Sequence, residues 1–132
     1  MKRTGSCLCG EVSFEAEPMP SMQACHCSMC RKWTAGPFMS VPCQGASFAG
    51  PVGEYASSEG NVRGFCRTCG SSLYFHPSHV LVHAIPISLF DDQSELPFRV
   101  EIFIDDKPDY YEFANPTKKM TGAEFMEKFR NK

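Results

Sequence analysis

The sequence lacks an excess of charge of either sign. It has 13 lysines and arginines against 15 aspartates and glutamates, for a formal net charge of -2, and its basic pairs, such as Arg31 and Lys32, are scattered. A nucleic-acid-binding surface needs lysine and arginine clustered on one face, because these side chains neutralise phosphates. The composition therefore disfavours a zinc-ribbon nucleic-acid binder, and we expect no nucleic-acid partner.

Long apolar runs are lacking as well. The longest, residues 80–90, contains His83 and Pro86 and is much shorter than the roughly 20 residues that cross a bilayer as a helix. Lys2 and Arg3 are not followed by the apolar segment of a secretory signal peptide. We therefore expect no membrane partner and a cytoplasmic, reducing location.

Repeats and low-complexity tracts are also missing from the sequence. A chain of 132 residues matches the usual length of one domain, so we expect a single domain over residues 1–132. Residues 11–17 alternate apolar and polar side chains, which is typical of a half-buried strand. Further segments of β-type composition, separated by glycine and proline, predict strands at residues 22–25, 38–41, 54–56, 73–75, 80–82 and 98–104.

Helical periodicity is scarce, and residues 121–130 alone read as a helix. Thr121 can cap its N-terminus, and Glu124, three residues later, completes a capping box. The sequence therefore predicts a mainly β fold with a short C-terminal helix. We expect bound metal to supply part of the stability of this small domain.

Against these absences stand eight cysteines. In a reducing compartment, grouped cysteines more often bind metal than form disulfides. Two distant pairs, each followed by a glycine suited to a tight turn, together offer the four thiolates of a closed tetrahedral zinc site. An alternative is a redox or disulfide-forming dithiol in the second pair. The four residues, here called the cysteine quartet, are Cys7, Cys9, Cys66 and Cys69.

A second group, the cysteine triad, consists of Cys25, Cys27 and Cys30. Three thiolates can bind one zinc and leave its fourth position open, which is typical of a catalytic rather than a structural site. A substrate thiol could bind there as a thiolate and make or break a carbon–sulfur bond with a carbonyl compound. Two alternatives would close the site, because His26 or Cys43 could supply a fourth ligand.

Three motifs of this chain resemble the glutathione-dependent formaldehyde-activating enzymes and their centromere-protein-V relatives. They lie within residues 5–71, and the order and spacing of their cysteine groups are specific. The motifs are Gly5-x-Cys7-x-Cys9-Gly10-x-Val12-x-Phe14, Cys25-His26-Cys27-x-x-Cys30-Arg31-Lys32 and Phe65-Cys66-x-x-Cys69-Gly70-Ser71.

The resemblance implies a β-tent fold with two zinc ions per chain, a structural one on the quartet and a catalytic one on the triad. It also implies carbon–sulfur lyase chemistry that joins glutathione and formaldehyde into S-hydroxymethylglutathione. The leading hypothesis is therefore a zinc-dependent carbon–sulfur lyase acting on an adduct of an aldehyde and a small thiol, with glutathione as the candidate. The alternative is a non-enzymatic, zinc-stabilised module that binds a protein.

The chain departs from the family pattern in two places. Glu101 precedes Ile102 where such proteins often have His-Ile, and Tyr110 stands where they often have tryptophan. A glutamate removes a possible proton donor and adds negative charge. If Glu101 faced the triad, it would disfavour an anionic thiol such as glutathione.

Overall fold

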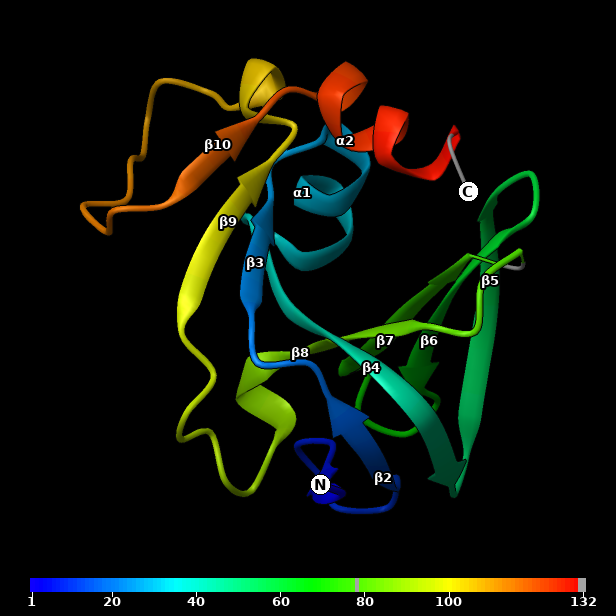
Figure 1. Cartoon of the computed structure of the whole chain (residues 1–132). Helices are drawn as coiled ribbons and strands as arrows, with labels where there is room; N and C mark the ends of the chain where they lie inside the picture. Colours follow the sequence, from blue (N-terminus) through cyan, green and yellow to red (C-terminus); the bar gives the residue numbers. More distant parts are fainter. Residues whose placement is uncertain (78, 131–132) are drawn as a thin grey trace. The chain divides into compact units, whose positions relative to one another are not determined.

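The computed structural model describes residues 1–77 and 79–130 (Figure 1). Most of its regular elements are strands, and a short helix lies near the C-terminus. The predicted mainly β fold and C-terminal helix are thus confirmed. The chain divides into two compact units, and each is described by itself. The organisation as one domain over residues 1–132 stays a prediction.

The first unit contains residues 1–20 and 40–96. Its strands pair antiparallel throughout, β1 with β2, β2 with β4, β4 with β8, and then β8, β7, β6 and β5 in sequence. A 3-10 helix, η1 (Ile87–Leu89), follows β8. The strands are β1 (Arg3–Ser6), β2 (Ser13–Pro18), β4 (Phe38–Ala49, from Ser40 in this unit), β5 (Val52–Ser58), β6 (Asn61–Cys66), β7 (Ser72–Pro77) and β8 (His83–Pro86).

The alternation predicted for residues 11–17 explains how β2 packs. Phe14 and Ala16 are buried, whereas Ser13 and Glu15 are exposed. The ring of Phe14 stacks on Phe48 of β4 with 5.3 Å between the ring centroids. Burial of apolar side chains from facing strands removes their surface from water and stabilises this unit.

The second unit contains residues 21–39 and the segment from Pro97 onward. In Figure 1, β3, β9 and β10 lie side by side, and they pair in parallel, β3 with β9 and β9 with β10. Parallel neighbours need a connection that returns the chain to the same end, and residues 103–117 make it between β9 and β10. The elements are β3 (Met22–Cys25), α1 (Ser28–Thr34), β9 (Phe98–Ile102), η2 (Ile104–Asp106), β10 (Lys118–Met120) and α2 (Gly122–Arg130).

The two helices begin differently. The predicted capping box is present at α2, where the Glu124 backbone N–H donates to Thr121 Oγ1 at 3.1 Å and the Thr121 N–H donates to Glu124 Oε1 at 2.8 Å. The sequence did not predict α1, which is short and is capped by the sulfur of Cys27 rather than by a hydroxyl or carboxylate. None of the helices within the described ranges is long and apolar enough to cross a membrane.

Candidate metal centres

The four sulfurs of the cysteine quartet converge in the first unit. Cys7 and Cys9 follow β1, whereas Cys66 ends β6 and Cys69 lies in the turn before β7. The Sγ atoms of Cys7 and Cys9 are 3.6 Å apart, those of Cys9 and Cys66 are 3.9 Å apart, and all four lie within 4.8 Å of one another. Sulfurs that bind one zinc tetrahedrally at about 2.3 Å lie about 3.8 Å apart, so this donor set fits the ion.

Local turns bring each pair of this quartet together. Gly10 and Gly70 have φ angles of 85° and 79°, in the left-handed region that glycine adopts without steric cost. The Gly70 N–H donates to the carbonyl of Cys66 at 2.8 Å, which closes the second turn. Backbone N–H groups also point at sulfur, from Val12 to Cys7 at 3.3 Å and from Cys69 to Cys66 at 3.5 Å. Such donors favour the thiolate form, which is the form that binds metal.

The thiols of the quartet lie so close together that their pKa values differ widely. Hydrogen bonds from the side chain and backbone of Ser71 lower the pKa of Cys69 to about 5. The backbone N–H of Glu11 favours the Cys9 thiolate, but loss of hydration and the three neighbouring sulfurs outweigh it and raise the pKa of Cys9 to about 12. Four thiolates this close repel one another unless a cation balances them. A divalent soft metal supplies that charge.

The cysteine triad lies in the second unit, where β3 leads into α1. Cys25 ends β3, Cys27 is the N-cap of α1, and Cys30 is in its first turn. The three sulfurs lie within 4.8 Å of one another, and the Cys30 N–H donates to the Cys27 sulfur at 3.4 Å. Cys27 has extended backbone angles, φ -64° and ψ 152°. The alternation of β3 therefore continues to Cys27 and places His26 on the opposite face.

The triad is also a set of thiols that requires a cation to ionise fully. Hydrogen bonding to Cys27 and then to Cys30, together with burial, raises the pKa of Cys25 far above its ordinary value. A soft divalent ion would reverse this by binding the thiolates directly. The chemistry and spacing of the three donors fit zinc, of which they would occupy three of the four usual positions.

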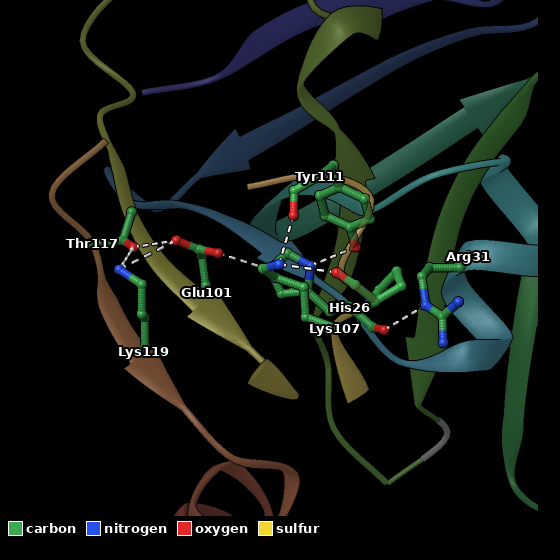
Figure 2. Close-up of polar contacts among 8 residues, drawn as sticks. His26, Arg31, Glu101, Lys107, Tyr111, Thr117 and Lys119 are labelled. Carbon is green, nitrogen blue, oxygen red and sulfur yellow. Dashed lines mark hydrogen bonds and ion pairs between the residues drawn. The ribbon is translucent and has the colours of Figure 1, made fainter. Parts of the chain in front are cut away.

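The ring of His26 has a polar partner at each of its two nitrogens, as Figure 2 shows. Its Nε2 lies 2.8 Å from Glu101 Oε1, and its Nδ1 lies 2.7 Å from the Tyr111 hydroxyl. His26 is 0% exposed and Glu101 is 1% exposed. Because both ring nitrogens already have partners, His26 has no lone pair to offer as a fourth ligand.

Glu101 is fully compensated in its buried position. It accepts a hydrogen bond from the Thr117 hydroxyl, and Lys119 Nζ lies 3.7 Å from its Oε2 (Figure 2). Burial acts to raise the pKa of Glu101, but the hydrogen bonds from Thr117 and His26 and the charge of Lys119 outweigh it and hold the pKa below its ordinary value. The carboxylate points into this set of partners, so its charge is balanced within the network rather than added to the triad.

Two basic side chains near the triad hold the backbone. Arg31 Nε donates to the His26 carbonyl at 2.9 Å, and a terminal nitrogen of the same guanidinium donates to the Asp106 carbonyl at 3.3 Å. Lys107 Nζ donates to the carbonyl oxygens of Pro108 and Tyr111 and lies over the Tyr111 ring (Figure 2). Their donors are directed at carbonyl groups of the chain, which stiffens the loops around the triad.

Cys43 takes part in neither cluster. It is fully buried in β4, its S–H donates to the Val41 carbonyl at 3.2 Å, and burial raises its pKa to about 12. Its sulfur belongs to neither group of converging metal-ligand atoms, and the residue packs as a small apolar group. Neither candidate for a fourth ligand of the triad is therefore suited to that role.

Sequence reasoning missed Tyr111 and Thr117. Tyr111 contacts His26, 85 positions away in the chain, and Thr117 contacts Glu101, 16 positions away. Tyr111 lies in the irregular connection between β9 and β10, so no periodicity marks it. The available signal was indirect: a histidine between two metal ligands of an extended segment points to the opposite face, and if it is buried there its ring nitrogens need hydrogen-bond partners.

The fold and the two clusters define a small β protein built around candidate zinc–thiolate centres. The sequence profile of the glutathione-dependent formaldehyde-activating enzyme family matches residues 2–106. The chain belongs to this family, as its motifs predicted.

Known relatives agree with this placement. An uncharacterized lyase of Schizosaccharomyces pombe is 39% identical over 127 residues, which cover 92% of this chain and 93% of the relative. A Halomonas elongata protein, named provisionally as a glutathione-dependent formaldehyde-activating enzyme, is 32% identical over 84% of this chain and 80% of its own length. The crystal structure of a Rhodobacter sphaeroides protein superposes with a TM-score of 0.58 at 20% identity, over 67% of this chain and 87% of that one. This last likeness shows a shared fold.

Proposed function

We propose that this chain is a zinc-dependent carbon–sulfur lyase that forms and cleaves the adduct of a small thiol, glutathione, with formaldehyde. Family membership supports activity of this class, and the names of the two relatives point to a lyase and to formaldehyde activation. The observation that carries the proposal is the triad itself. Three convergent sulfurs stand beside a histidine whose two ring nitrogens are already bonded elsewhere.

The two clusters would divide the work. The quartet, with four thiolates, would hold a structural zinc, whereas Cys25, Cys27 and Cys30 would hold a catalytic one. A zinc ion in the triad would supply a Lewis-acidic position at which a thiol ionises at neutral pH. The chain's own part is to hold three sulfurs in place and to keep the nearby carboxylate of Glu101 paired, so that it does not repel an anionic thiol.

The reaction balances without an oxidant or reductant. The sulfur of the thiol attacks the carbonyl carbon of formaldehyde, a carbon–sulfur bond forms, and the proton lost by the thiol ends on the former carbonyl oxygen. Cleavage runs the same steps in reverse. The chain needs only to bind, orient and ionise the thiol, which is within the means of a preorganised three-thiolate site.

The alternative, a zinc-stabilised module that binds a protein, predicts a triad closed by a fourth protein ligand. His26 and Cys43 were the candidates, and both have other partners in the structure. The geometry therefore favours the lyase.

The proposal is tested by the rate at which glutathione and its formaldehyde adduct interconvert, measured by exchange NMR with zinc-loaded protein. We expect acceleration over the spontaneous rate by the wild type and by Cys43→Ser, which leaves both clusters intact. Cys27→Ser should abolish the acceleration. A wild-type protein with two zinc ions that leaves the spontaneous rate unchanged, with glutathione and with other small thiols, would exclude the lyase.

A further inference from the structure

We propose that Glu101 is a positioning residue for the cysteine triad, acting through His26 to hold residues 25–27 in the geometry that brings the three sulfurs together. The inference rests on the metal-binding role proposed for the triad. The new element is that Glu101, a buried carboxylate of β9, supports the geometry of the triad although its hydrogen bonds go to His26 and Thr117 rather than to the three cysteines.

His26 is bound at every polar group that it possesses. Its backbone N–H donates to the Ile102 carbonyl at 3.1 Å, and its carbonyl accepts from Arg31 Nε at 2.9 Å. Its ring nitrogens contact Glu101 and Tyr111 at 2.8 and 2.7 Å. Since two triad cysteines flank His26 in the chain, rotation of this residue would displace both of their sulfurs.

The strand register explains why Glu101 can reach this histidine. In the parallel pairing of β3 with β9, Glu101 lies opposite Ala24 and Ile102 opposite Cys25. Ala24 and His26 share one face of the extended segment, and Cys25 and Cys27 share the other. Glu101 therefore holds His26 on one face while the sulfurs gather on the opposite face.

Glu101 is itself anchored from the next strand. Lys119 of β10 lies opposite Glu101 in the register, and its Nζ approaches Oε2 at 3.7 Å. The Thr117 hydroxyl donates to the same oxygen, which leaves Oε1 to His26. An ionised carboxylate only accepts hydrogen bonds, so it matches these donors on both oxygens. Removing it would leave a buried ring nitrogen of His26 without its partner.

The test compares metal binding by Glu101→Leu, Glu101→Gln and the matched control Glu112→Leu, whose exposed carboxylate lies in the same unit. Zinc affinity is measured by competition with a chelator, and cobalt(II) replaces zinc to report thiolate coordination by absorption. Cys27→Ser defines the signal of the quartet alone. Groups hydrogen-bonded directly to metal ligands typically alter metal affinity about 10- to 100-fold. Glu101 acts one step further out, through His26, so we expect Glu101→Leu to weaken zinc binding at the triad by the lower end of that range, about 10-fold.

The quartet should keep its metal in Glu101→Leu, which separates a local effect from general unfolding. Glu101→Gln retains an oxygen acceptor for His26, so this variant should keep most of the wild-type zinc affinity at the triad. Glu112→Leu should bind zinc as tightly as the wild type. If Glu101→Leu fails to fold, Thr117→Val removes one anchor of Glu101 and should weaken the triad by a smaller factor.

Wild-type affinity and an unchanged cobalt spectrum in both Glu101→Leu and Thr117→Val, or a wild type that binds no metal at the triad, would overturn the inference. The readout is metal binding, so it stands apart from the lyase. Weakened binding in Glu101→Leu together with a wild type that does not accelerate the reaction would exclude the proposed activity and leave the positioning role intact.

Discussion

Serine substitutions at Cys69 and at Cys27 should have unequal consequences for the fold. Each removes one candidate ligand, the first from the quartet and the second from the triad. We expect Cys69→Ser to unfold or become insoluble. Cys27→Ser should remain folded and lose one zinc ion per chain.

The size of the difference follows from the chain length that each metal would link. The quartet joins Cys9 to Cys66, 57 positions apart. Treated as a cross-link, a loop of that length restricts the unfolded chain by about 4 kcal/mol, whereas the loop from Cys25 to Cys30, about 5 residues, contributes about 2 kcal/mol. Small domains are stable by about 5–15 kcal/mol in total, so the first loss is a large fraction of the free energy of unfolding.

The assay combines zinc content by mass spectrometry with thermal unfolding followed by circular dichroism. For a chain of this length we expect the midpoint to fall by about 10–20 °C in Cys69→Ser, if the protein folds at all, and by about half as much in Cys27→Ser. Cys43→Ser serves as the control and should keep both zinc ions. Equal destabilisation by Cys69→Ser and Cys27→Ser would refute the division between a structural quartet and a triad that is open to substrate.

Two further predictions concern stability. The pKa of His83 is lowered from its ordinary value of 6.5 to about 4, first by burial and then by the charge of His76. The two imidazole rings stack with 4.0 Å between their centroids. Between these two pKa values the folded chain binds fewer protons than the unfolded one, so the contribution of His83 to the free energy of unfolding is complete above pH 6.5 and is lost toward pH 4. Allowing for the partial exposure of His83, this contribution is about 1–3 kcal/mol. Urea unfolding between pH 4 and 7 should show a flatter pH profile in His83→Gln, and an identical profile would contradict this. Thr121→Ala should lose about 1 kcal/mol in the same assay at pH 7, because it removes the cap of α2, whereas Thr121→Ser keeps the hydroxyl and should not; an equal loss in both would argue against the capping box.

Departures from the predicted elements have physical causes. Residues 80–82 have strand-type composition, but the structure starts β8 at His83, and Leu81 is 89% exposed. A run of branched side chains becomes a strand only if a neighbouring strand pairs with it, and the pairing of β7 with β8 begins beyond this run, at Phe75 and Ala84. The helix α1 was missed because seven residues give too little periodicity.

The sequence by itself determined what depends on near neighbours in the chain. The burial of Phe14 and Ala16, the capping box of α2 and the grouping of the cysteines all follow from spacings of a few residues. Local spacing sets which side chains share a face and which turns can close, so these features could be predicted without knowing the rest of the fold.

The tertiary structure alone decided which distant segments meet. Glu101 and Tyr111 are 75 and 85 positions from His26, and the parallel register of β3 with β9 places the carboxylate beside the ring. Strand pairing is chosen by the packing of the whole chain, because many segments of similar composition could form the same backbone hydrogen bonds. The partners that hold residues 25–27 in place are therefore a property of the fold, whereas the cysteines themselves are a property of the sequence.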